Sequence, residues 1–397
     1  MKKVGMLIII FIIFTLTDVV AEEKLTSKDA KILKSRKTEI NLIDKQIKIK
    51  RFVYNSGLNF KYPDAVRGIY VTGNSAGGTH FSNLLDLVDN TDLNAMVIDI
   101  KDDFGRLTYK VDEKSPFKEY ADNYIDDLRG LLEVLEEKEI YPIARVVVFK
   151  DSEYANKHPE YSFLDNGKVW VNNRGEAFVN PFEEAVWEHN LAIAKEVAEI
   201  GFKDIQFDYV RFPEGFETRE ETLKYSLGKY KDMDLDHTQK RVEAVTDFVK
   251  YAREELSAYD VDVSIDIFGY AATIPEAPGI GQNFSKISEH TDVISSMIYP
   301  SHWTSYFGIE FPDEEPYKVI YEYAKVENEV LGKLKTKPIS RPWIQDFSAP
   351  WLYDGPSKIY GKTDVEDQIR ALSENGIDEY LLWNPSNQYT QGVKYIQ

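Results

Sequence analysis

The hydrophobic pattern from about residue 66 onward alternates between short apolar runs and longer amphipathic segments. The short runs are rich in Val, Ile and aromatic residues and predict strands at 66–73, 95–100, 143–149, 205–210, 261–268, 293–299, 339–347 and 379–383. Between them, apolar residues recur every three or four positions and predict helices at 79–89, 125–138, 182–200, 238–257, 283–290, 316–334 and 364–374. Strands that alternate with helices indicate one parallel sheet covered by helices, and the number of strands favours a closed (β/α)8 TIM barrel.

An open, doubly wound sheet is the alternative architecture. A nucleotide-binding sheet of that kind has a glycine-rich phosphate loop after its first strand. The stretch GNSAGG at 73–78 occupies this position, but it matches neither the GxGxxG nor the Walker pattern. We interpret it as an ordinary loop between a strand and a helix.

The first 64 residues differ in character from the rest of the chain. Two lysines, an apolar run from Met6 to Phe14 and a small residue, Ala21, before a charged stretch indicate a secretory signal peptide over 1–21. An uncleaved N-terminal anchor is the alternative, although the apolar run is short for a membrane span. Residues 22–64 are highly charged and predict a tether, so the domain is expected over 65–397 and the protein is expected outside the cytoplasm.

Composition narrows the possible partners. The chain has no Cys, so an exported domain of this kind would depend on its core rather than on disulfides for stability. The net charge of −19 disfavours nucleic acid and teichoic-acid-like polyanions as partners and suits a neutral or cationic substrate better. Aromatic residues make up 13% of the chain, which is compatible with platforms that stack on sugars. We therefore expect a carbohydrate partner, with membrane contact only through the N-terminus.

Several predicted strands carry an acidic residue near their C-terminal ends, where a parallel barrel places its chemistry. Asp208 lies on the fourth strand, Asp99 on the second, Asp266 on the fifth and Asp346 on the seventh. The alternation of side chains puts Asp266 on the same face as Ser264 and, by the same argument, groups Asp99 with Lys101. The four carboxylates are therefore expected to converge on one mouth.

Paired carboxylates at a barrel mouth are what cleavage of a glycosidic bond requires. One carboxylic acid protonates the leaving oxygen, while a carboxylate attacks or stabilises the oxocarbenium-like centre. Crowding separates the pKa values of such groups, so that one stays protonated while the other stays charged. We expect further residues to bind the substrate, namely Asp99, Lys101, Arg145, Arg211, Tyr299, His302, Trp303, Arg341, Trp343, Gln345, Trp383 and Asn384.

Four motifs in this order resemble a glycoside hydrolase-like barrel family of exported bacterial proteins, related distantly to barrels of the α-amylase and α-galactosidase type. The motifs are FDYVRFP at 207–213, SIDIFG at 264–269, MIYPSHW at 297–303 and RPWIQDF at 341–347. The resemblance spans about residues 65–397. It implies a nucleophile at Asp208, an acid at Asp266 and a stabilising carboxylate at Asp346. Because the amylase-type acid is usually Glu, the choice of acid between Asp266 and Asp346 stays open, as does the anomeric outcome.

Other chemistries lack their sequence signals. The six His are scattered without HxxxH or HExxH spacing, so we expect no metal and no cofactor. A Ca²⁺ site near Asp99, Asp102 and Asp103 is less consistent with the sequence than a solvated acidic loop. There is no GxSxG elbow for serine chemistry. The alternative from another class is a non-catalytic barrel that binds glycans, which would keep the aromatic residues without needing the strand-end acids.

Overall fold

The computed structural model describes residues 53–352 and 358–397. The predicted signal peptide and residues 22–52 of the predicted tether lie outside the described residues, and both remain predictions. None of the helices in the described ranges has the length and apolar character needed to span a bilayer.

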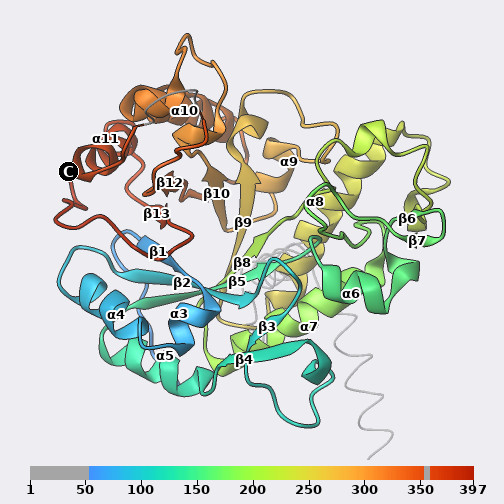
Figure 1. Cartoon of the computed structure of the whole chain (residues 1–397), viewed down its shortest axis with the longest axis horizontal. Coiled ribbons are helices and arrows are strands. Elements are labelled where there is room, and N and C mark those ends of the chain that lie inside the picture. Colours follow the sequence, from blue (N-terminus) through green and yellow to red (C-terminus); the bar gives the residue numbers. More distant parts are fainter. Residues whose placement is uncertain (1–52, 353–357) are drawn as a thin grey trace, which may run out of the picture. The chain divides into compact units, whose positions relative to one another are not determined.

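Eight parallel strands, counted over the described residues, close a barrel (Figure 1). They are β1 (Arg67–Val71), β2 (Ala95–Lys101), β5 (Tyr141–Val147), β8 (Asp204–Asp208), β9 (Asp262–Phe268), β10 (Val293–Met297), β12 (Trp343–Gln345) and β13 (Tyr380–Trp383). Each strand pairs in parallel with the next along the chain, and β13 pairs with β1 to complete the ring. The prediction of a closed barrel is confirmed, and an open doubly wound sheet is excluded.

Helices connect successive strands, as the amphipathic segments predicted. The α-helices are α3 (Gly73–Gly77), α4 (Phe81–Asp89), α5 (Leu128–Glu137), α6 (Ser152–Lys157), α7 (Glu184–Ile200), α8 (His237–Leu256), α9 (Phe284–Ser288), α10 (Pro316–Leu331) and α11 (Lys362–Ser373). In α5 the buried residues are Leu128, Leu131, Leu132 and Leu135, which is the spacing of one helical face. The loop predicted at 74–78 is instead the short helix α3, which the Thr72 hydroxyl caps by accepting a hydrogen bond from Ser75 N.

Three parts of the fold were not predicted. After β2 the chain adds β3 (Leu107–Tyr109), antiparallel to β2, and β4 (Ala121–Ile125), parallel to β3. After β5 a hairpin of β6 (Leu164–Asp165) and β7 (Lys168–Val169) forms part of the long loop before α7. The seventh predicted strand is divided into β11 (Ile339–Ser340) and β12, because Pro342 between them has no N–H to donate to the sheet.

The core has two layers. Inside the barrel, apolar side chains pack around the axis; they include Val66, Ala95, Val97, Ile143 and Leu381. Between the strands and the helices, the outward residues of each strand join the buried helix faces in a larger cluster. This arrangement fills the barrel below its mouth and leaves the C-terminal ends of the strands for the site.

The last residues of the predicted tether pack on the barrel. Leu58 is buried. The Tyr62 hydroxyl donates to Glu379, which directly precedes β13, at 2.8 Å, and accepts a hydrogen bond from Arg341 at 2.8 Å. Residues Tyr54–Gln397 group together by their contacts, so the structured part of the chain begins before the predicted boundary at 65.

Candidate active site

A cavity of about 710 Å³ lies at the C-terminal ends of the barrel strands, within the usual size of a small-molecule site. Strands β5, β8, β9, β10, β12 and β13 contribute its walls, together with the loops that follow β2, β5, β8, β9 and β10. The sequence-predicted residues that line it are Arg145, Asp208, Arg211, Asp266, Tyr299, His302, Trp303, Trp343 and Trp383. The sequence therefore located both carboxyl groups of the cavity floor and several of the aromatic residues of its wall.

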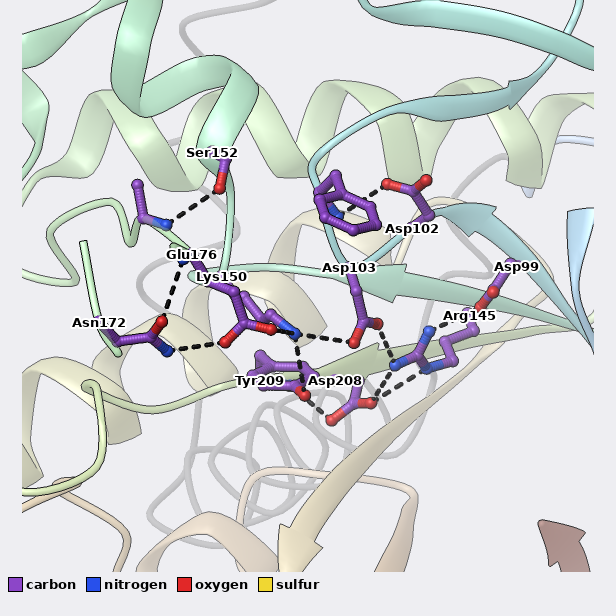
Figure 2. A network of polar contacts seen from close by, with 12 residues as sticks. Asp99, Asp102, Asp103, Arg145, Lys150, Ser152, Asn172, Glu176, Asp208 and Tyr209 are labelled. Carbon is purple, nitrogen blue, oxygen red and sulfur yellow. Dashed lines mark hydrogen bonds and ion pairs between the residues drawn. The ribbon is translucent and has the colours of Figure 1, made fainter. Parts of the chain in front are cut away.

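Arg145 is the centre of an ion-pair network at the floor of this cavity (Figure 2). Its guanidinium group donates to Asp208 Oδ2 through Nη2 at 2.6 Å and through Nε at 3.0 Å. The same group pairs with Asp99 at 2.6 Å and with Asp103 at 2.8 Å. All three carboxylates come from the ends of neighbouring strands, β2 and β8, on either side of β5. A fully buried cation therefore fixes the orientation of Asp208.

The backbone after Asp208 makes a sharp turn that also holds this carboxylate. Tyr209 adopts a left-handed conformation with φ of 52°, which is uncommon for a residue with a Cβ. Its own N–H donates to Asp208 Oδ1 at 2.6 Å, and its carbonyl accepts from Arg211 N at 2.8 Å. Both Asp208 oxygens thus accept hydrogen bonds, which hold the carboxylate in one orientation. Local strain at such a position is typical of functional sites.

Asp266 lies in the same cavity in a different environment. It is 2% exposed, and its Oδ1 accepts a hydrogen bond from Trp343 Nε1 at 2.7 Å. Burial, followed by the charge of Asp208, raises the pKa of Asp266 well above its usual value. Its second oxygen, Oδ2, has no hydrogen bond within the described residues. Asp266 is therefore a carboxyl group that binds a proton more readily than an ordinary aspartate does.

Gly269, at the end of the motif that contains Asp266, lies very close to Met297 and Ile298. Gly269 lines the cavity, and a Cβ at this position would lie 2.8 Å from Met297 O and 2.9 Å from the side chain of Ile298. A larger residue would therefore force Gly269 or these neighbours to shift. The glycine of the SIDIFG motif thus has a packing role beside Asp266.

Two further carboxyl groups, those of Asp99 and Asp103, contact Arg145 at the floor of the cavity. Burial raises the pKa of Asp99 to about 6, although Arg145 and the Tyr70 hydroxyl, which donates to Asp99, act in the opposite direction. Burial also opposes ionisation of Asp103, but the charges of Arg145 and Lys150 lower its pKa to about 2. Asp99 does not line the cavity. It lies behind Arg145 and supports it rather than facing a ligand.

Aromatic rings form much of the remaining wall. Trp383 stacks on Tyr70 with ring centroids 4.0 Å apart, and the Arg145 guanidinium lies 5.5 Å from the Trp383 centroid. Tyr299 lies beside His302, with centroids 5.1 Å apart. Burial lowers the pKa of His302. Rigid rings of this kind offer apolar faces to the C–H surface of a sugar.

The structure corrects the placement of two predicted substrate-binding residues. A bulge in β2 between Asp99 and Lys101 reverses the alternation, so Lys101 points away from the mouth and pairs with Asp151 at 2.6 Å. Arg341 lies at the opposite end of the barrel, where it pairs with Asp204 at 2.7 Å and Glu379 at 2.8 Å. Both cations are fully buried, and neither lines the cavity.

Three other predicted residues support loops instead of lining the cavity. Asp346 accepts hydrogen bonds from Thr390 Oγ1 at 2.5 Å and from Thr390 N at 3.0 Å. Asn384 Nδ2 donates to Asp346 O at 2.5 Å. Gln345 Oε1 accepts from Ser301 N at 3.0 Å, which holds the loop after β10. The structure thus brings Asp208 and Asp266 together but leaves Asp346 outside their cavity.

Some wall residues were not expected as site residues. They are Asp103, Glu214, Phe268, Gly269, Tyr270, Thr273, Ile274, Met297, Thr304 and Tyr306. Most follow the C-terminal end of a strand within a few residues, and that position was the available signal. Among residues 53–352 and 358–397, no group of three or more His, Asp or Glu is arranged to hold a metal ion.

Comparison with known proteins agrees with this geometry. The family model described as "Putative glycosyl hydrolase domain" matches residues 68–389. The chain matches no curated protein. A hypothetical protein from Ruminiclostridium thermocellum is 30% identical with a TM-score of 0.42, and the match covers 50% of this chain and 96% of that one.

More distant structures share the barrel. The glycoside hydrolase domain of PgaB (BpsB) from Bordetella bronchiseptica is 13% identical with a TM-score of 0.60, over 81% of this chain and 94% of that one. A β-galactosidase from Halorubrum lacusprofundi is 13% identical with a TM-score of 0.54, over 80% of this chain and 52% of that one. At such identities the likeness shows the fold alone. Because the family model matches residues 68–389, which span most of the closed barrel, this chain belongs to the family described as "Putative glycosyl hydrolase domain".

Proposed function

We propose that the protein is a glycoside hydrolase that cleaves an extracellular or cell-wall poly- or oligosaccharide with Asp208 and Asp266. The observation that carries the proposal is the contrast between these two carboxyl groups in one cavity. Asp208 is paired with the buried guanidinium of Arg145, whereas burial and the neighbouring charge raise the pKa of Asp266. One charged and one protonated carboxyl group form the pair that glycosidic cleavage needs.

In this mechanism Asp266 donates its proton to the departing glycosidic oxygen. The Trp343 N–H holds Oδ1, which leaves Oδ2 to carry the proton. Asp208 supplies negative charge to the anomeric carbon as the bond breaks, and water completes the hydrolysis. Arg145 and the Tyr209 N–H keep Asp208 oriented. Asp346, which lies outside the cavity, has no part in these steps.

The proposal also includes the location of the protein. A signal-like N-terminus over residues 1–21 supports export, and a polysaccharide substrate would then be met outside the cell. Expression of the full chain followed by separation of cells and medium tests this. Recovery of the protein with the cytoplasmic fraction alone would contradict export.

The enzymatic proposal is tested by the release of new reducing ends from α- and β-linked polysaccharides, including amino-sugar polymers. The full chain should release reducing ends from at least one polymer, and Asp208→Asn should release none while keeping its fold. If the wild type binds a polymer but cleaves none of them, the protein is the non-catalytic glycan-binding barrel instead.

A further inference from the structure

A second, smaller cavity opens beside the main one. It has a volume of about 190 Å³. Arg174, Tyr209, Arg211 and Glu214 line both cavities. The small cavity therefore lies next to the carboxylate pair, with Tyr209 and Arg211 on the boundary. A chain of sugars bound across Asp208 would place a neighbouring unit in it.

Arg211 is fixed at this boundary but is only partly hydrogen-bonded. Its side chain is 6% exposed, and its guanidinium lies 4.7 Å from the ring centroids of both Tyr209 and Phe268. Of its five N–H donors, one binds Phe212 O at 3.2 Å and one binds Glu214 at 3.1 Å. No other hydrogen bond of this group occurs in the described part of the chain. Because Glu214 is 62% exposed, it can swing away when a ligand arrives.

Arg174 adds a second guanidinium that also lines both cavities. It is exposed on the loop between β7 and α7. Within the described residues its guanidinium makes no ion pair or hydrogen bond, although its charge contributes to the lowered pKa of Glu176. The carboxylate nearest to it along the loop, Glu176, is already paired with Lys150 at 2.8 Å and bonded to Asn172 at 2.7 Å (Figure 2). The charge of Arg174 is therefore available to a ligand.

We propose that the small cavity is a subsite for a sugar unit that carries an anionic substituent, held by Arg174 and Arg211. The recognised group is a carboxylate, a sulfate ester or a phosphate ester, since each presents paired oxygens that match the guanidinium fork. This inference rests on the proposed function, because it specifies the substrate class of that same cavity. The substrate would then be an acidic glycan.

The net charge of the chain does not exclude such a ligand. The −19 charge is spread over the whole sequence, and salt screens exposed charges beyond about 8 Å at physiological ionic strength. Contact with two guanidinium groups acts at shorter range. A neutral sugar could also use these donors through its hydroxyl groups, so the test must separate charge from hydrogen bonding.

The experiment measures binding by calorimetry in the Asp208→Asn variant of the full chain, so that no ligand is consumed. The probes are galacturonic acid tetrasaccharides, the matching neutral galactose tetrasaccharides, and the neutral chain bearing a sulfate or a phosphate ester. The added substitutions are Arg174→Gln, which keeps hydrogen-bonding groups without charge, and Arg174→Lys, which keeps the charge. Arg370→Gln on α11 is the matched control for loss of one surface cation.

At least one anionic probe should bind more tightly than its neutral counterpart. Arg174→Gln should lower the affinity for that probe by roughly tenfold, as expected for loss of one charge-assisted contact. It should change the affinity for the neutral probe by less than about twofold. Arg174→Lys should recover most of the loss, and Arg370→Gln should change neither probe. The relative response of the three anionic probes identifies the substituent.

Equal affinities for anionic and neutral probes, or equal losses of both in Arg174→Gln, would overturn the subsite. Failure of the subsite and failure of the hydrolase are separate outcomes. Cleavage of neutral polymers without any preference for charge would leave the hydrolase standing and remove the subsite. Selective binding of acidic probes without cleavage of any polymer would support the subsite and contradict the hydrolase.

Discussion

Replacement of Arg145 by Met tests the view that one buried cation organises the floor of the site. The substitution keeps a side chain of similar length but removes a guanidinium that contacts Asp99, Asp103 and Asp208 at 2.6–3.0 Å. Asp103 is 37% exposed and can be solvated in its place, whereas Asp99 and Asp208 are only 7% and 6% exposed. Two buried carboxylates would thus lose their counter-charge.

Removal of one partner from a buried ion pair costs about 3–5 kcal/mol. Residues 54–397 form the folded unit, and at about 2.1 cal/mol/K per residue its unfolding entropy is roughly 0.7 kcal/mol/K. The cost therefore corresponds to a fall in Tm of about 4–7 °C at neutral pH. The deficit should shrink in acid, because loss of Arg145 raises the pKa values of the carboxyl groups and protonation then removes their charge.

Thermal unfolding at pH 7 and pH 4 measures this loss of stability. The proteins compared are the wild type, Arg145→Met and the double variant Arg145→Met/Asp99→Asn. The double variant should recover more than about 1 kcal/mol of the loss, since it removes one unpaired buried carboxylate. An Arg145→Met protein that unfolds at the wild-type temperature, or a deficit that is the same at both pH values, would refute the reasoning.

Three further predictions concern the proposed acid Asp266, its hydrogen-bond partner Trp343, and Asp346 outside the cavity. Asp266→Asn should abolish turnover yet raise stability near neutral pH. Because the pKa of Asp266 is raised in the folded protein, the stability of the wild type falls as the pH rises above the pKa of an unfolded aspartate, about 3.9. Denaturation at pH 4 and pH 7 should therefore show the gain in stability of the variant mainly at pH 7. Trp343→Phe removes a hydrogen bond that lowers the pKa of Asp266, so the alkaline limb of the pH–activity profile should move to higher pH, and an unmoved limb would argue against Asp266 as the acid. Asp346→Asn should cost about 1–2 kcal/mol in denaturant unfolding through its bonds to Thr390 while activity stays within about twofold, and a large loss of activity would return Asp346 to the mechanism.

Much of the barrel could be predicted because its signals are local. Strand and helix periodicities, together with the break at Gly201 before β8, define the alternation. Side-chain alternation then placed Asp266 inside the barrel, and its position near the C-terminal end of a strand placed Asp208 at the mouth. Pro342 was visible in the sequence inside the seventh predicted strand, and a proline at such a position indicates a break.

What could not be predicted depends on contacts between distant segments. The bulge that turns Lys101 outward has no local signal; it is stabilised by Asp151 and Asn190, which lie far along the chain. Arg341 precedes the C-terminal half of its strand, so its partner is Asp204 at the start of β8 rather than a ligand at the mouth. That Arg174 makes no ion pair could be recognised only after the partners of Glu176 were known.

The most direct test of the central claim is the rate of reducing-end release by Asp208→Asn on a polymer that the wild type cleaves, with Asp86→Asn on the exposed face of α4 as the matched control. We predict that Asp208→Asn loses at least about a thousandfold in rate, as expected for a carboxylate that acts on the reacting carbon, while its circular dichroism spectrum and glycan binding persist. The control should keep wild-type activity. A folded Asp208→Asn protein that cleaves the polymer at the wild-type rate would contradict the account.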